Sequence, residues 1–101
     1  IIISVDGGGN MALDLDLIRK DIDQVDKEIV ALLEKRMDLV SQVVAYTKEN
    51  KKEILDTGRE QAVLERVESL VKNPDYKTTI RDSFADLMAQ SRAYQKERLD
   101  D

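Results

Sequence analysis

The sequence predicts an all-α fold with three helices, one of them very long. Its 101 residues include one proline and four glycines, and three of those glycines are consecutive at positions 7–9. So few breaks elsewhere favour long helices over a β fold with many turns. Apolar residues make up 42% of the chain and charged residues 37%, which suits a small core with exposed helical faces. A chain of this length forms one small domain.

The first predicted helix covers residues 14–50, where no glycine or proline interrupts the chain. Inward positions recur every three or four residues, at Ile18, Ile22, Val25, Ile29, Leu32, Arg36, Val40, Val43 and Thr47. Such a helix spans roughly 55 Å, whereas a compact domain of about 100 residues has a radius of gyration of about 13 Å. A monomer, even one kinked near Lys51, would leave apolar surface in water. We therefore predict a homodimer with its long helices paired about a two-fold axis.

Two shorter helices are predicted after residue 56. Thr57 and Glu60 have the spacing of a capping box and open the second helix, whose apolar residues are Val63, Leu64, Val67, Leu70 and Val71. Asn73-Pro74-Asp75 ends it. Thr79 begins the third helix, with Ile80, Phe84, Leu87, Met88, Ser91 and Gln95 on one face.

Residues 1–10 differ from the rest of the chain, because three isoleucines precede Asp6-Gly7-Gly8-Gly9-Asn10. We interpret Met11 as the natural start and residues 1–10 as an extension added for expression, with a native flexible tail as the alternative. The predicted domain is therefore 11–101.

The composition excludes several kinds of chemistry. Without cysteine or histidine, the chain has no thiol chemistry and lacks the commonest metal ligand and general base. We therefore predict no metal and no other cofactor. A formal net charge of −5 argues against nucleic acid as a partner. No apolar run reaches membrane-spanning length, and a cytoplasmic protein is predicted.

Four polar residues occupy inward positions where hydrophobic ones are expected, namely Arg36, Arg59, Ser91 and Gln95. Each has an ordinary interpretation on its own. An arginine at an inward position, such as Arg36, can pair with a carboxylate or extend to solvent. A serine can act as a small packing residue. Taken together on three helices, they indicate a pocket for a small polyanion.

An ordered set of residues with characteristic spacing extends along the chain: Ile18-Arg19, Ile22-Asp23, Val25-Asp26, Ile29, Leu32-Leu33, Arg36-Met37, Leu39-Val40, Asp56-Thr57-Gly58-Arg59-Glu60 and Ser91-Arg92-Ala93-Tyr94-Gln95. In this set the chain resembles, from Leu13 to about Gln95, the all-α (AroQ-type) chorismate mutase family.

The resemblance implies an intertwined six-helix homodimer with two sites for chorismate, which is rearranged to prephenate for phenylalanine and tyrosine biosynthesis. This unimolecular reaction needs no nucleophile, metal or cofactor. It is accelerated by holding the reactive conformer and by hydrogen-bond donors at the ether oxygen. The implied substrate-binding residues are Arg19 from the partner chain, Arg36, Asp56, Arg59, Glu60 and Ser91, and Gln95 faces the ether oxygen.

The sequence departs from the family at one catalytic position. A lysine is expected eleven residues after Arg36, and residue 47 is threonine. Thr47 lies about 20° from Arg36 around a helix, whereas Lys48 lies about 120° away, so only a bulge near residues 44–48 would bring Lys48 round. We therefore predict a chorismate-binding fold with much reduced mutase activity.

Two other functions remain open within this fold. An isochorismate-pyruvate lyase uses a similar arginine clamp on a similar substrate. A non-catalytic, mutase-like module would dimerise or bind a shikimate-pathway synthase as a regulator. A plain coiled-coil dimer is disfavoured, because it does not need Ser91 and Gln95 facing inward.

Overall fold

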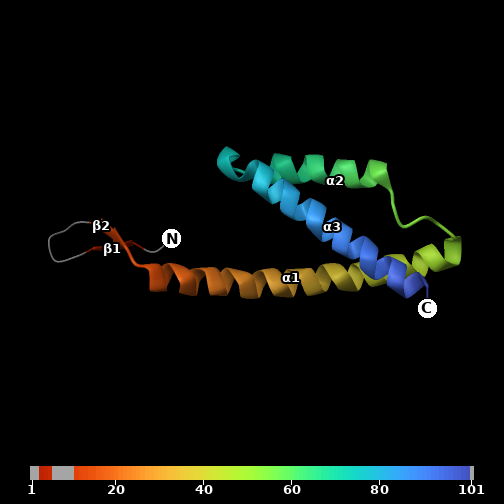
Figure 1. The fold of residues 1–101 in the computed structure, drawn as a ribbon, viewed down its shortest axis with the longest axis horizontal. Helices are drawn as coiled ribbons and strands as arrows, with labels where there is room; N and C mark the ends of the chain where they lie inside the picture. Colours follow the sequence, from red (N-terminus) through yellow and green to blue (C-terminus); the bar gives the residue numbers. More distant parts are fainter. Residues whose placement is uncertain (1–2, 6–10, 101) are drawn as a thin grey trace. The chain divides into compact units, whose positions relative to one another are not determined.

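The computed structural model describes residues 3–5 and 11–100, with side chains described from Leu13 to Asp100. Its helices are α1 (Leu15–Asn50), α2 (Thr57–Leu70) and α3 (Lys77–Leu99), and a 3-10 turn, η1 (Pro74–Tyr76), precedes α3 (Figure 1). The predicted all-α class and its three helices are confirmed. The chain divides into two units, Ile1–Arg36 and Met37–Asp101.

A small strand pair precedes the helices, and the sequence pattern had not indicated it. Strand β1 (Ile3–Val5) pairs antiparallel with β2 (Met11–Leu13), with Ile3 opposite Leu13. Residues 1–2 and 6–10 of the predicted extension lie outside the described residues. The origin of residues 1–10 therefore stays a prediction.

Helix α1 has a defined cap at each end. The Asp14 carboxylate accepts the backbone N–H groups of Asp16 at 3.0 Å and Leu17 at 3.2 Å, which satisfies donors that lack a helical partner. At the other end Lys51 has a φ of 52°, and the N–H of Lys52 donates to the Thr47 carbonyl at 3.2 Å. This is the bond of a Schellman ending. The helix is α-helical throughout residues 15–50.

Two predicted helix starts need correction. Asp56, not Thr57, caps α2, because its carboxylate accepts the Arg59 N–H at 2.9 Å and Thr57 is already the first helical residue. Helix α3 begins at Lys77, two residues before the predicted Thr79. The Asn73 side chain caps the 3-10 turn at the Asp75 N–H, and that turn leads directly into α3.

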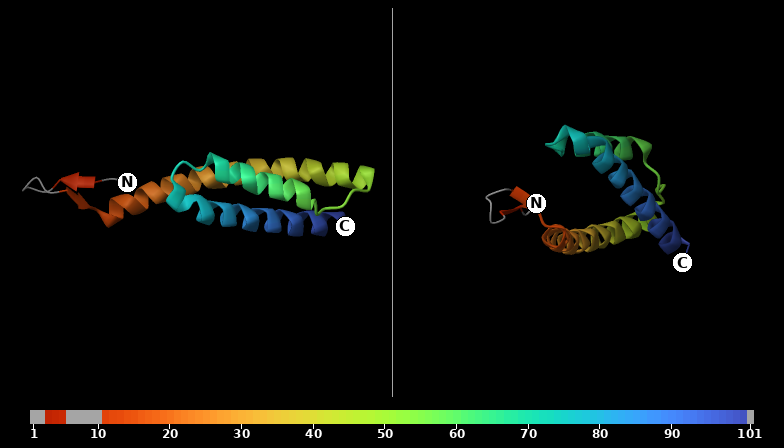
Figure 2. Two further views of the ribbon diagram at one scale, coloured as in Figure 1. Left: turned by 90° about the horizontal axis from the view of Figure 1, so that it is seen from above. Right: turned by 60° about the vertical axis from the view of Figure 1, so that its left-hand side comes forward.

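Helices α2 and α3 run in opposite directions from this turn and pack against each other (Figures 1 and 2). Their core contains Val63 and Val67 from α2 and Met88 from α3. Leu64, Ile80 and Phe84 pack around it. None of the helices within residues 11–100 is both long and apolar enough to cross a membrane.

Candidate functional site

The buried polar side chains of the described residues are Thr47, Ser91 and Gln95, which are 5%, 5% and 9% exposed. Thr47 lies on the last turns of α1, and the other two lie one turn apart on α3. Thr47 also follows the buried Val44 by three residues, so both face the same side of α1. The inward positions derived from helical phase agree with the burial of these three side chains, whereas Arg59, which was also predicted to lie inward, is exposed.

The hydrogen bonds of Ser91 and Gln95 determine what each can offer a ligand. The Ser91 hydroxyl donates to the Leu87 carbonyl at 2.9 Å, and Nε2 of Gln95 donates to the Ser91 carbonyl at 3.2 Å. A hydroxyl has one hydrogen and an amide nitrogen has two. Gln95 therefore retains a second amide hydrogen for donation.

The N-cap and the first turn of α2 carry the other predicted residues of the second unit. Asp56 and Arg59 are exposed, and the Asp56 carboxylate is occupied in capping the helix. Glu60 is half-buried, and its Oε1 forms an ion pair with Nη1 of Arg92 on α3. This ion pair brings the Glu60 end of α2 to the segment of α3 that carries Ser91 and Gln95.

Arg19 and Arg36 belong to the first unit, both on α1. Arg19 is exposed, and Arg36 is half-buried. They are seventeen residues apart in the sequence. Their role as a carboxylate clamp stays a prediction.

Lys48 is not one of the buried polar residues. It is exposed and lines a cavity of about 230 Å³ together with Ser41, Val44, Tyr94 and Arg98. Since α1 is regular through this turn, it has no bulge that would turn Lys48 toward the side of Thr47. That Lys48 does not replace the cation expected at position 47 stays a prediction.

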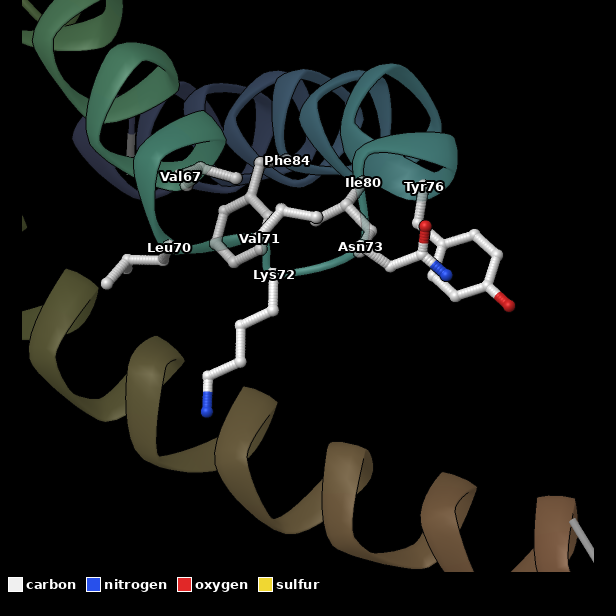
Figure 3. Close-up of a pocket in the computed structure, with 8 residues that line it drawn as sticks. All are labelled: Val67, Leu70, Val71, Lys72, Asn73, Tyr76, Ile80 and Phe84. Carbon is white, nitrogen blue, oxygen red and sulfur yellow. The ribbon is translucent and has the colours of Figure 1, made fainter.

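A second recess lies at the turn between α2 and α3 and is mainly apolar. Its volume is about 480 Å³, and Figure 3 shows the eight side chains around it. They are Val67, Leu70, Val71, Lys72, Asn73, Tyr76, Ile80 and Phe84. The predicted core residue Leu70 is 71% exposed here, so it borders the recess rather than filling the core.

Reasoning from the sequence missed two features of this region. Arg92 was not identified as the partner of Glu60, because 32 residues separate them and no short-range spacing links them. Tyr94 was also missed. Its hydroxyl lies 3.3 Å from that of Ser41, and the Arg98 guanidinium carbon lies 4.8 Å from the centre of its ring. The four-residue spacing of Tyr94 and Arg98 on a helix was the signal available.

These contacts lower the pKa of Tyr94 below its ordinary value of 10.0. The largest cause is the hydrogen bond with Ser41, followed by the one with Arg98. Partial desolvation and the negative charge of Asp38 act in the opposite direction. The contacts therefore favour the phenolate in this part of the fold.

A family model described as chorismate mutase type II matches residues 18–96, which is most of the chain. The matched segment begins in the first turn of α1 and ends in the last third of α3, so it contains every predicted site residue. A comparison with curated proteins finds no match, and neither does one with solved structures.

Proposed function

Because this chain belongs to the chorismate mutase type II family, we propose that it binds chorismate and rearranges it to prephenate, at a rate that Thr47 lowers. The observation that carries this proposal is the burial of Thr47, Ser91 and Gln95 within the matched segment. A polar side chain buried in so small a fold lowers stability unless it is hydrogen-bonded to the protein or to a ligand.

The reaction breaks the ether C–O bond of chorismate and forms a C–C bond within the same molecule. No proton is transferred, so the chain needs no general base. Arginines bind the two carboxylates with charge-assisted hydrogen bonds and select the compact reactive conformer. The second amide hydrogen of Gln95 donates to the ether oxygen, where negative charge develops in the transition state.

Thr47 supplies less of this stabilisation than a lysine does. Its hydroxyl is neutral and sits on a short side chain, so it cannot place a positive charge beside the ether oxygen. Loss of one preorganised donor typically lowers a rate by about 10²–10³-fold. We therefore expect slow turnover from a site that retains its other polar groups.

The direct test compares the consumption of chorismate by the chain and by Thr47→Lys. We expect the substitution to raise kcat by about 10²–10³-fold. Thr47→Met is the matched control, because it adds similar length without charge and should leave kcat low. Equal rates for all three proteins would show that position 47 does not face the reacting atoms.

A second candidate function is a mutase-like module that binds the ligand without turning it over. The uncharged Thr47 favours it, since the fold then retains binding groups but lacks the cation. Calorimetry with prephenate, run on the chain and on Thr47→Lys, separates the two functions. Binding without turnover in both proteins supports the module, whereas turnover by Thr47→Lys supports the enzyme. Release of pyruvate from isochorismate would instead indicate a lyase.

The proposed active form is the intertwined homodimer. Buried hydrophobic side chains among the described residues are limited to Val44, Val63, Val67 and Met88, which is a small core for an independent domain. Several apolar side chains on α1 remain at least 45% exposed, including Ile22, Val25, Ile29 and Leu32. A second copy that covers them supports both stability and, through its Arg19, the site.

A further inference from the structure

Glu60 and Arg92 form an ion pair that links α2 to α3 beside the predicted site. Oε1 of Glu60 accepts a hydrogen bond from Nη1 of Arg92. The Glu60 side chain is 23% exposed and that of Arg92 is 34% exposed, so both are partly withdrawn from water. Arg92 directly follows the buried Ser91 on α3, and all three residues lie in the unit Met37–Asp101. The substrate-binding residues that the family resemblance implies include Glu60 but not Arg92.

A carboxylate at this place opposes the ligand that the proposed function requires. Chorismate and prephenate each carry two carboxylates, so a Glu60 anion without a partner would repel them. Partial burial strengthens this repulsion, because less water screens the charges. Arg92 offsets the negative charge of Glu60 through the ion pair. The formal charge of the pair is therefore zero, and the pair does not repel a dianion as a single carboxylate would.

The ion pair also leaves Glu60 able to accept further hydrogen bonds. An ionised carboxylate has two oxygens with about four acceptor sites, and the bond from Nη1 of Arg92 is made to Oε1. Because a guanidinium is planar and rigid, it restrains the direction in which a bonded carboxylate points. Arg92 therefore holds the Glu60 carboxylate in place while acceptor capacity remains for a hydroxyl of the ligand.

We propose that Arg92 is a positioning residue of the chorismate site. It holds the Glu60 carboxylate and offsets its charge, so that the site accepts a ligand with two carboxylates. Arg92 acts through Glu60 and does not contact the ligand itself. This inference rests on the proposed function, because only an anionic ligand beside Glu60 makes the offset necessary.

The test is a calorimetric titration of the intact chain and its variants with prephenate at low ionic strength. Arg92→Gln leaves Glu60 as an anion without a partner and should raise the Kd about tenfold. Arg92→Lys keeps the positive charge, and its Kd should stay within about threefold of the parent value. The double variant Glu60→Gln/Arg92→Gln has no unpaired anion, so its Kd should also stay within about threefold of the parent value.

The double variant distinguishes this role from two others. If the ion pair only joined the two helices, Glu60→Gln would break it as Arg92→Gln does, and both single variants and the double variant would bind equally weakly. If Arg92 contacted the ligand directly, the double variant would bind as weakly as Arg92→Gln. Either result would overturn the proposal. Recovery of binding in the double variant is expected only when Arg92 acts by offsetting the charge of Glu60.

Arg81 and Glu68 provide the matched control, because they form a second ion pair between α3 and α2. Nε of Arg81 lies 2.9 Å from Oε1 of Glu68, and both side chains are more exposed than those of Glu60 and Arg92. Arg81→Gln removes one cation and one ion pair between the same helices, and it should leave the Kd unchanged. An equal rise of the Kd in Arg81→Gln and Arg92→Gln would overturn the proposal, because it would indicate only general attraction to positive charge.

The parent protein separates failure of this inference from failure of the proposed function. A parent that does not bind prephenate contradicts the proposed function and this inference with it. A parent that binds prephenate no more tightly than Arg92→Gln does contradicts this inference alone. Because the substituted side chains are partly exposed, circular dichroism should show unchanged helical content in every variant.

Discussion

In the proposed function, the side chain at position 47 decides whether bound chorismate reacts quickly or slowly. Thr47 is 5% exposed, and its carbonyl also accepts the closing bond of α1 from Lys52. The helix ending therefore fixes the backbone at position 47. That backbone sets the direction in which a longer side chain at this position extends. Burial makes a cation added at this position unfavourable in the protein without ligand. The same burial strengthens its interaction with negative charge on a bound ligand.

We predict that Thr47→Lys lowers the free energy of unfolding by about 1–3 kcal/mol at neutral pH, because an ammonium in a buried position loses hydration and its pKa falls. Urea denaturation measures this difference, with Thr47→Val as the control of similar shape. A saturating dicarboxylate ligand such as prephenate should restore part of the stability of Thr47→Lys. A variant as stable as the parent without ligand would indicate that position 47 opens to water in solution.

Tyr94 gives the chain a stabilising contribution that appears only at alkaline pH. Its pKa is lowered in the folded protein, first by Ser41 and then by Arg98. A lowered pKa favours the phenolate in the folded state, so the contribution is absent at neutral pH. It grows as pH rises through the folded pKa and is complete above the unfolded value of 10.0.

We therefore predict that Tyr94→Phe loses stability more steeply than the parent between about pH 9 and about pH 11. Thermal unfolding followed by circular dichroism across this range measures the two slopes. Tyr76→Phe is the control, because Tyr76 is 58% exposed and should follow the parent. Parallel curves for Tyr94→Phe and the parent would contradict the role of Ser41 and Arg98.

At the scale of the elements, the sequence and the structure assign the start of α2 to different residues. The capping-box spacing points to Thr57, whereas the structure has the Asp56 carboxylate on the Arg59 N–H. Both side chains are exposed, so either can be removed without opening the core. The helix start can therefore be tested by stability alone.

We predict that Asp56→Ala lowers the free energy of unfolding by about 1 kcal/mol, the usual value for an N-cap. Thr57→Ala should change it by no more than about 0.5 kcal/mol. Urea denaturation of the two variants gives the comparison. A larger loss of unfolding free energy in Thr57→Ala than in Asp56→Ala would show that Thr57 is the N-cap, as the sequence pattern predicts.

Helical phase predicted the elements better than their ends. Val63, Val67 and Met88 were placed inward, and they form the core. Leu70 follows the same phase but is exposed, because α2 ends at this residue and the chain turns away. The end of a helix depends on capping contacts and on the path of the next segment. The spacing of apolar residues carries no information about either.

At the scale of the whole molecule, the predicted site depends on contacts that the sequence only partly encodes. The buried positions of Thr47, Ser91 and Gln95 followed from phase within single helices. The pairing of Glu60 with Arg92 depends on how α2 and α3 pack, which residue spacing along one helix does not specify. The burial of Thr47 and the exposure of Lys48 did follow from phase, because one residue turns a helix by about 100°.

The exposed apolar face of α1 leads to the prediction for the assembly. Ile29 is 45% exposed and belongs to the row of predicted inward positions on α1, which we call the stripe. Ala31 is also exposed, but it lies about 200° from Ile29 around the helix. If two copies pair along the stripe, Ile29→Lys buries an unpaired charge at the interface, and Ala31→Lys places the same charge in water.

We therefore expect the parent and Ala31→Lys to sediment as dimers at micromolar concentration and Ile29→Lys to sediment as a monomer. The Tm of the two dimeric proteins should rise with protein concentration, because dissociation accompanies unfolding. If Arg19 completes the partner's site, Ile29→Lys also loses binding of prephenate, although its own second unit is unchanged. A monomeric parent that still binds prephenate would show that one chain forms the whole site and that the stripe serves another purpose.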